Sequence, residues 1–546
     1  MRWLAAPSLA ERSRFAYSTA MTTRLAAFKP KFIAQLSIIR AFSATMTPLK
    51  HRAVASSFIF KFPDDDTSQK PQVALFRRSD KVSTYRHKYA GVSGSVEEAD
   101  ENPLATAWRE LQEETTLTSD SLRLFRQGKP FSFIDESIGR EWTINPFGFV
   151  LKSGTEGGRG EAGIKIDWEH EGYEWFDPDV VSESDDFEGV PRILESLRRV
   201  WFNIDLGEDA GNTLGEGLIT LQRDHESGAR QLASTALGIF INVVRQLDPS
   251  SRDQWWKNVR SAGWHLWRNG RESMGAPILN AILSSLTLID RTLPPDGELS
   301  GNAIRKIVAV LESHSQERQD SSVKISMSFE AFVEQHLPGE GPLKILTLSS
   351  SSTVTSGITQ VLQKNLRPVE LRVLESRPLF EGVKMAKAIA SFANENKLQA
   401  RLSVFTDASV SAAAQNIDMV LLGADLIDRT ANVSNKTGSL PAVLTAKHIS
   451  PNVKVVALSE KEKVLPFNPP GQEENDPQEV TQAWCDVGLS SKTSNPSVDV
   501  KNIYFEWVPS HMIDHYVTED GVTSSEGITE RAEVVRKQAD RYFIGL

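Results

Sequence analysis

Three glutamates with helical spacing are the residues of this chain best placed to do chemistry. Glu110, Glu113 and Glu114 stand at positions i, i+3 and i+4, which puts them on one face of a helix. Carboxylates crowded in this way repel one another unless a cation lies among them. Oxygen ligands suit a hard divalent ion, and Mg²⁺ also binds substrate phosphates. The spacing predicts a Mg²⁺ site, with Mn²⁺ as the second choice; the simpler alternative is a solvated acidic helix face.

The wider spacing resembles the Nudix box, G-x5-E-x7-R-E-U-x-E-E-x-G-U, in which U is a bulky aliphatic residue. Glu101 lies eight residues before Arg109, and the run Arg-Glu-Leu-x-Glu-Glu follows. The resemblance implies a hydrolase of a nucleoside diphosphate-linked or related pyrophosphate metabolite. It implies that Arg109 orients the cluster through Glu101, and that the metal ligands are Glu110, Glu113 and Glu114.

Both glycine positions of the box differ from the pattern. Gly94 stands one residue further from Glu101 than the pattern asks, so either the loop holds an extra residue or Ser95 takes the glycine position. Thr116 stands where a glycine would end the helix in a left-handed conformation, which a β-branched residue adopts poorly. Both departures concern loop geometry and leave every carboxylate in place.

Runs of β-branched and aromatic residues on both sides of the box predict strands at 53–60, 72–78, 130–134 and 142–151. A helix from 191 to about 202 would close the domain. Residues 164–176 resemble the late strand of the Nudix family, in which Glu169 and Glu171 are candidates for a further metal ligand or general base. Solvation of a strand end explains these two acids equally well. We expect a Nudix α/β/α sandwich with a mixed sheet over residues 49–205.

Composition narrows the functional classes. A length of 546 residues suggests three or so folded units. The net charge of -10 argues against a general nucleic-acid binder, which needs a basic face. Cys485 is the single cysteine, so an intramolecular disulfide and a cysteine zinc cluster are both excluded. No apolar run approaches eighteen residues, and we expect no membrane span.

The first 48 residues differ from the rest, because seven Lys and Arg face one acid, Glu11. This composition is typical of a mitochondrial presequence, and Arg40 before Ser43 marks a processing site. The alternative is an untranslated upstream region, since Met21 and Met46 offer later starts. We expect a mitochondrial protein if residues 1–45 are a genuine presequence, and a cytoplasmic one otherwise.

The remaining chain divides into three segments. Residues 206–216 are rich in glycine and polar residues and are predicted to be a linker. Apolar residues recur at helical spacing from 217 to about 338, which predicts a helical subdomain. From 339 to 546, β-rich runs alternate with helices. This alternation predicts a Rossmann-like, mostly parallel α/β domain that binds ligands beyond the carboxyl ends of its strands.

Polar residues gather at those strand ends. The run from Ser349 to Thr353 lies between a strand and a helix N-terminus, a place that favours an anion such as a sugar phosphate. Asn435 and Lys436 are expected to open a later helix. The phosphate-binding candidates are Ser350, Ser351, Ser352 and Thr353. The further candidates are Ser349, Arg377, Asp425, Asn435 and Lys436.

Four motifs in this half resemble the family that joins the translation initiation factor 2B alpha, beta and delta subunits to methylthioribose-1-phosphate and ribose-1,5-bisphosphate isomerases. They are Leu374-Glu375-Ser376-Arg377-Pro378 with Glu381-Gly382, Thr406-Asp407-Ala408, Gly423-Ala424-Asp425 and Asn435-Lys436-Thr437-Gly438. The resemblance covers roughly residues 215–546. It implies an acid/base aspartate at Asp425, whereas Ser349 stands where the isomerases have a cysteine. A hydroxyl is far less acidic than a thiol.

A second departure concerns the helical subdomain, where Met274 replaces the arginine that the isomerases have before Gly-Ala. Three readings of this half therefore stay open: an isomerase of a ribose 1-phosphate, a regulatory subunit like those of initiation factor 2B, and a sugar-phosphate or nucleotide sensor or scaffold. The partners expected are phosphorylated small molecules and further copies of the chain, bound through the C-terminal half.

Overall fold

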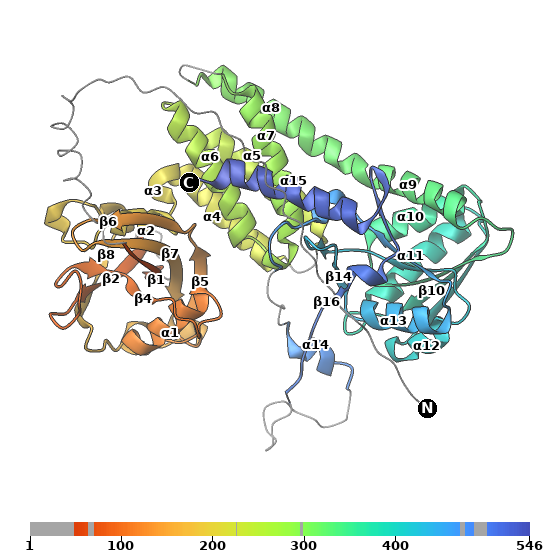
Figure 1. The fold of residues 1–546 in the computed structure, drawn as a ribbon, viewed down its shortest axis with the longest axis horizontal. Helices are drawn as coiled ribbons and strands as arrows, with labels where there is room; N and C mark the ends of the chain where they lie inside the picture. The colour runs from red at the N-terminus through yellow and green to blue at the C-terminus, as the bar shows by residue number, and fades with distance from the viewer. Residues whose placement is uncertain (1–48, 64–69, 225–226, 295–298, 470–474, 485–498) are drawn as a thin grey trace, which may run out of the picture. The chain divides into compact units, whose positions relative to one another are not determined.

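A computed structural model describes residues 49–63, 70–224, 227–294, 299–469, 475–484 and 499–546 (Figure 1). The presequence-like segment and Cys485 lie outside these residues. Among the described residues, contacts group 49–51 with 134–141 in a small unit, and those of 52–133 and 142–546 in a large one. In the small unit, Asp135 accepts hydrogen bonds from the backbone N–H of Ser137 at 2.9 Å and from its hydroxyl.

The first sheet of the chain is antiparallel in the pairs β1 with β2 and β4, β2 with β3 and β8, and β5 with β7. Its strands are β1 Lys50–Lys61, β2 Gln72–Arg78, β3 Tyr89–Ala90, β4 Val92–Ser95, β5 Leu122–Gln127, β6 Phe131–Asp135, β7 Arg140–Leu151 and β8 His170–Phe176. The strands expected from the sequence are all present. The segment predicted as a late strand from 164 forms one only from His170.

Two helices cover opposite faces of this sheet. Alternate residues of β1 and β2 point to opposite sides, so that Ile59 and Phe76 pack with α1 Pro103–Thr115, and Phe60 and Leu75 pack with α2 Ile193–Arg198. The result is the expected α/β/α sandwich. The closing helix predicted for 191–202 is shorter in the structure, where it is α2, and a second short helix, α3 Asn203–Leu206, follows it.

The linker predicted for 206–216 is wrong, because most of it lies in helix α4 Glu208–Arg223. Its glycines serve close packing. A Cβ at Gly211 would lie 2.6 Å from the side chain of Asn203, and one at Gly217 would lie 2.5 Å from Ile239. Glycines that let neighbouring side chains approach closely give a segment the same composition as a flexible linker. This similarity explains why the linker prediction was wrong.

The predicted helical subdomain is present. Its further helices are α5 Ala229–Gln246, α6 Arg252–Asn269, α7 Gly275–Thr292, α8 Gly301–Glu317 and α9 Ser321–His336. The apolar faces of α4 to α8 form one core, to which the C-terminal helix α15 Ser525–Phe543 contributes Val535, Tyr542 and Phe543, whereas α9 packs against the parallel sheet of the C-terminal half.

The C-terminal half holds a seven-stranded sheet with the order β11-β10-β9-β12-β15-β17-β18. Every pair is parallel except β17 with β18. The strands are β9 Leu343–Leu348, β10 Val369–Leu374, β11 Ala400–Phe405, β12 Met419–Leu422, β15 Lys454–Leu458, β17 His515–Thr518 and β18 Gly521–Thr523. The first six follow the doubly wound Rossmann order, in which the direction of winding reverses between β9 and β12.

Helices cover both faces of this sheet, as expected for repeated βα units. One face packs against α9, α10 Ser352–Gln363 and α11 Glu381–Glu395. The other packs against α12 Val410–Ala413, α13 Ser439–Ile449 and α15. Among the described residues there is one further α-helix, α14 Pro477–Thr481.

The sequence suggested that Asn435 and Lys436 open a helix, but in the structure they do not. They end strand β14 Val433–Lys436 of a small antiparallel sheet with β13 Leu426–Ile427 and β16 Phe505–Val508. Helix α13 begins only at Ser439, because Gly438 adopts a left-handed conformation with φ 107°.

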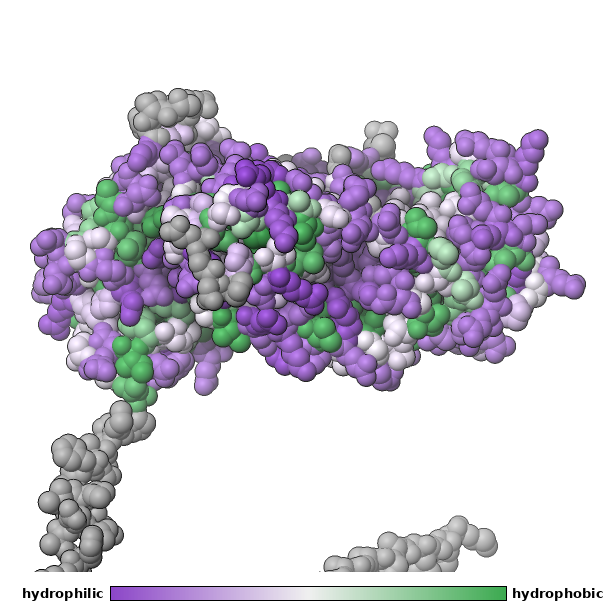
Figure 2. All heavy atoms as spheres, turned by 90° about the horizontal axis from the view of Figure 1, so that it is seen from above, coloured by the Kyte–Doolittle hydropathy of each residue, from purple (hydrophilic) through white to green (hydrophobic). Residues whose placement is uncertain are grey.

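The face shown in Figure 2 carries scattered hydrophobic residues among polar ones. Within the described ranges, no helix has the length and apolar character needed to cross a membrane.

Candidate functional sites

Helix α1 positions the acidic residues of the first site. Asn102 caps its start, accepting hydrogen bonds from the backbone N–H of Leu104 at 3.0 Å and of Ala105 at 3.1 Å. Its end is Thr116, whose φ of 60° is left-handed, the conformation expected of a glycine at this position. The N–H of Thr116 still donates to the carbonyl of Gln112 at 3.0 Å. Thr116 therefore fills the glycine position at a cost in backbone strain.

Arg109 pairs with Asp100, and the prediction that it acts through Glu101 is wrong. Its Nε and Nη2 donate to the two carboxylate oxygens of Asp100 at 3.2 and 3.1 Å. This pairing lowers the pKa of Asp100 and raises that of Arg109. Glu101 is exposed and forms no ion pair within the described ranges. The spacing from Gly94 could have identified Asp100 as the acid of the box, because five residues separate the two, as the box requires.

Gly94 itself holds the glycine position, and the extra residue of the loop lies between Asp100 and Arg109. A Cβ at Gly94 would lie 1.8 Å from Glu110 Oε1, so any side chain there would push this carboxylate away. Ser95 contributes its carbonyl, which accepts from Arg109 Nη2 at 3.3 Å. Glu110 in turn lies 2.7 Å from Arg109 Nη1.

Glu114 is the most deeply buried of the three glutamates, with 3% of its surface exposed. Its Oε2 lies 2.6 Å from Nε2 of His170, while its Oε1 has no hydrogen-bond partner. Burial and the nearby carboxylates of Glu169, Glu110 and Asp167 raise the pKa of Glu114. Burial also lowers the pKa of His170 to about 4. The sequence reasoning missed His170, although it stands between the two candidate glutamates of the late strand.

Of those two candidates, Glu169 belongs to this site and Glu171 does not. Burial and Asp167 raise the pKa of Glu169, which lies within electrostatic range of Glu114. Glu171 instead pairs with His87 at 2.7 Å and Arg77 at 3.6 Å.

The donor chemistry of this cluster suits a hard divalent cation. Glu114 has a buried, unpartnered carboxylate oxygen, and burial, together with neighbouring carboxylates, raises the pKa of Glu110, Glu114 and Glu169. In the described part of the chain, however, no three acidic or histidine side chains converge as a ready metal site. Arg109 holds Glu110 and Glu113, and His170 holds Glu114. Of the predicted ligands, Glu113 is the most exposed, at 59% of its side chain.

The second site lies where the winding of the parallel sheet reverses. The loop after β9 and the Gly423–Asp425 turn after β12 meet there, because a Cβ at Gly423 would lie 3.1 Å from Ser351 and 3.4 Å from Asn435 Oδ1. Burial raises the pKa of Asp425, and the charges of Lys463, Lys436 and Arg271 oppose this. The structure thus brings Asp425, Asn435 and Lys436 together, as predicted.

Two of the predicted phosphate-binding hydroxyls already have partners. Ser351 caps α10 by accepting from the N–H of Val354 at 3.3 Å, and Thr353 donates to Glu460 at 3.0 Å. Ser350 and Ser352 are exposed. Ser349 adopts a left-handed φ of 69°, and its N–H donates to Ser376 Oγ at 2.8 Å.

Arg377 lies on the neighbouring loop after β10. Asp407 fixes this loop by accepting from the N–H groups of Ser376 and Arg377 at 2.9 and 2.8 Å. Lys436 pairs with Glu381 at 2.6 Å, and not with Asp425.

Sequence reasoning missed four charged residues of this site. Arg271 supplies a guanidinium near Asp425, three residues before Met274. The other three form a buried network: Arg230 pairs with Glu460, and Lys463 lies 3.1 Å from Glu460 and donates to the carbonyl of Ala424. Burial alone would raise the pKa of Glu460, but Lys463 and Arg230 lower it instead. Glu460 and Lys463 follow β15, so the rule of strand ends would have found them.

Comparison with known families matches both halves. The model of the initiation factor 2 subunit family matches residues 226–525, and the model of the NUDIX domain matches residues 55–197. NUDIX domains generally use divalent metal ions and bind phosphorylated small molecules.

Relatives match the C-terminal half. A probable bifunctional methylthioribose-1-phosphate isomerase/methylthioribulose-1-phosphate dehydratase of Nocardia farcinica is 30% identical over 201 residues, covering 34% of each chain. The ribose 1,5-bisphosphate isomerase of Archaeoglobus fulgidus is 27% identical over 247 residues, covering 42% of this chain and 74% of the relative. This chain thus spans about a third of the length of the first relative. The crystal structure of eIF2B beta from Chaetomium thermophilum aligns with a TM-score of 0.45 and 16% identity, covering 61% of this chain and 94% of that one.

Proposed function

Because the chain belongs to the initiation factor 2 subunit family and carries a NUDIX domain, we propose that it hydrolyses a nucleoside diphosphate-linked or related pyrophosphate metabolite with Mg²⁺ or Mn²⁺. The observation that carries this proposal is Glu114, a buried carboxylate with one unpartnered oxygen among Glu110, Asp167 and Glu169. Burial raises the pKa values of Glu110, Glu114 and Glu169, and a divalent cation would stabilise their charged forms.

In this proposal each residue has a distinct task. Glu110, Glu114 and Glu169 hold the ion, and Glu113 joins them from the exposed side. Asp100 fixes the guanidinium of Arg109, which keeps Glu110 and Glu113 in place. When bound, the ion supplies Lewis-acid activation of a phosphoryl oxygen and of an attacking water. His170 orients Glu114.

The test is turnover of a panel of nucleoside diphosphate derivatives by the full chain in Mg²⁺, measured as phosphomonoester release. We expect Glu114→Gln to lower kcat at least about 100-fold, because it removes one ligand charge, and EDTA to abolish turnover. Glu171→Gln is the matched control, since this acid belongs to another ion-pair group. Unchanged turnover in Glu114→Gln would refute the assignment.

A second candidate function is supported by Asp425, whose raised pKa and cationic neighbours fit an acid/base group beside a sugar phosphate. In this proposal the C-terminal half isomerises a ribose 1-phosphate. Ser349 and Met274 weaken it. The assay offers methylthioribose 1-phosphate and ribose 1,5-bisphosphate to the full chain and follows ketose formation. Thermal stabilisation by these compounds without turnover would instead favour a sensor or regulatory subunit.

The proposal also includes the oligomeric state and the cellular location of the protein. We expect the C-terminal half to form homo-oligomers, and light scattering of the purified chain would contradict this by giving the mass of a monomer, 60.6 kDa. If residues 1–45 are a presequence, a fluorescent protein fused behind residues 1–48 reaches mitochondria; otherwise the protein acts in the cytoplasm.

A further inference from the structure

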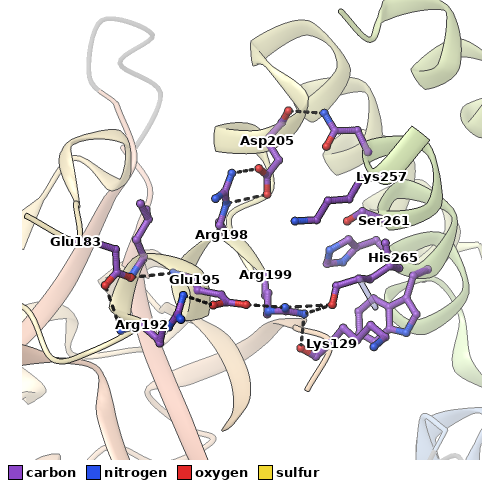
Figure 3. A pocket seen from close by; sticks show the side chains of 14 residues that line it. Lys129, Glu183, Arg192, Glu195, Arg198, Arg199, Asp205, Lys257, Ser261 and His265 are labelled. Carbon is purple, nitrogen blue, oxygen red and sulfur yellow. Dashed lines mark hydrogen bonds and ion pairs between the residues drawn. The ribbon is translucent and has the colours of Figure 1, made fainter. Parts of the chain in front are cut away.

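A cavity of about 300 Å³ lies entirely within the large unit and away from both sites described above (Figure 3). Helices α2 and α6, the loop after β5 and the end of the chain line it. Figure 3 shows the side chain of Lys257 extending from α6 toward Arg198. Ser261 and His265 lie behind it on the same helix.

The lining is basic in a chain that is acidic overall. Five basic side chains, Lys129, Arg192, Arg198, Arg199 and Lys257, face three acidic ones, Glu183, Glu195 and Asp205, which leaves an excess of two positive charges. The net charge of the whole chain is -10. If Leu546 ends the chain, its carboxylate reduces the local excess to one.

The three acids already have partners. Asp205 binds Arg198 through both oxygens, and Glu195 binds Arg199 at 3.0 Å and Arg192 at 3.4 Å. Glu183 accepts from the backbone N–H groups at the start of α2 at 3.1, 3.0 and 3.4 Å.

Two ammonium groups remain for a ligand, because Arg199 already donates through Nη1 and Nη2 to Leu546 O at 3.1 Å and through Nη2 to Glu195 at 3.0 Å. Lys129 and Lys257 form no ion pair with any acid in the described ranges. Burial and the charge of Arg199 lower the pKa of Lys129, so these two cations lie close enough to repel each other. An anion in the cavity would relieve this repulsion.

We propose that this cavity is a binding site for the phosphate group of a small phosphomonoester, separate from the hydrolase and sugar-phosphate sites. Lys129 and Lys257 supply the charge, and the hydroxyl of Ser261 donates a hydrogen bond. Tetrahedral oxyanions suit donors that approach from several sides, as here. The buried rings of Trp264 and His265 form the wall against which the rest of the ligand packs.

The proposal is tested by calorimetry of the full chain in EDTA with inorganic phosphate and with 5′-AMP, and with uncharged adenosine as the negative ligand. We expect the double variant Lys129→Gln/Lys257→Gln to bind either phosphate at least 10-fold more weakly. Lys306→Gln, an exposed lysine of α8, is the matched control. Ser350→Ala/Ser352→Ala tests the loop after β9, and we expect this variant to bind as the parent does.

Acetylation footprinting by mass spectrometry gives a second measurement that needs no variant. Phosphate should protect Lys129 and Lys257 from acetic anhydride, and should leave Lys306 unprotected. The proposal is overturned if the parent chain binds neither phosphate, if the lysine variant binds as the parent does, or if only the serine variant loses binding.

Discussion

Arg109 is the charge around which the acidic residues of α1 are arranged. Its guanidinium contacts Asp100, Glu110 and Glu113, and it offsets part of their mutual repulsion. Because the side chain is only 28% exposed, water screens these contacts incompletely. The position of the carboxylates therefore depends on a residue that binds no metal itself.

At this scale we predict that Asp100→Asn lowers hydrolase turnover about 10- to 100-fold, because an amide cannot hold both nitrogens of Arg109 by charge. Glu101→Gln should keep turnover, since Glu101 is exposed and unpaired among the described residues. Steady-state kinetics of the two variants separate the roles. A larger loss of turnover in Glu101→Gln than in Asp100→Asn would show that Glu101 is the acid that orients Arg109.

Thr116 offers a stability prediction that does not depend on catalysis. A left-handed φ of 60° costs a β-branched residue about 1 to 2 kcal/mol, which glycine avoids. We expect Thr116→Gly to raise the free energy of unfolding by about 1 kcal/mol, measured by urea denaturation. In the control Thr118→Gly, where the backbone is not left-handed, glycine should lower it.

Helix α6 carries a buried histidine that makes stability depend on pH. His265 accepts a hydrogen bond from Asn269 at 2.9 Å, and its ring packs on Phe202. Burial, with the charges of Arg126 and Arg199, lowers its pKa to about 3 from the ordinary 6.5. The helix thus holds a neutral imidazole at neutral pH.

Between these two pKa values the unfolded chain binds a proton at His265 that the folded chain does not. The contribution of the neutral His265 side chain to the free energy of unfolding is therefore complete above pH 6.5 and is lost as the pH falls toward 3. We predict that His265→Gln flattens the decline of the unfolding free energy over this window, measured by urea titrations at several pH values. An unchanged slope would show that this histidine titrates normally in the folded chain.

At the scale of the whole molecule, Arg230 joins the helical subdomain to the parallel sheet. It comes from α5, and it binds both Glu460, after β15, and Thr353, at the start of α10. Only 5% of the Glu460 side chain is exposed. Removing one partner of a buried ion pair costs more stability than the intact pair contributes, because the other charge is left buried without a partner.

We expect Glu460→Gln to destabilise the chain by about 3 kcal/mol, since it leaves Arg230 and Lys463 without their acid. Glu533→Gln, which breaks an exposed pair with Arg536, should leave stability almost unchanged. A double-mutant cycle with Arg230→Met measures the coupling of the buried pair. A coupling near zero would show that the two subdomains are not joined by this contact.

The sequence by itself determined the elements and the carboxylates of α1. Periodicity and β-branched runs placed the strands and the parallel sheet, because local propensity and burial agree there. Spacing along one helix also placed Glu110 and Glu114 correctly, since helical geometry is local. The predicted linker failed because packing glycines and flexible glycines look alike in a sequence.

Only the tertiary structure decided which charged side chains contact one another. A one-residue insertion moved the partner of Arg109 from Glu101 to Asp100, and no local rule says on which side of an acid an insertion falls. His170, Arg230 and Arg271 reach their sites from segments distant in sequence. Their charges count only where folding removes water around them, because burial strengthens every electrostatic contact.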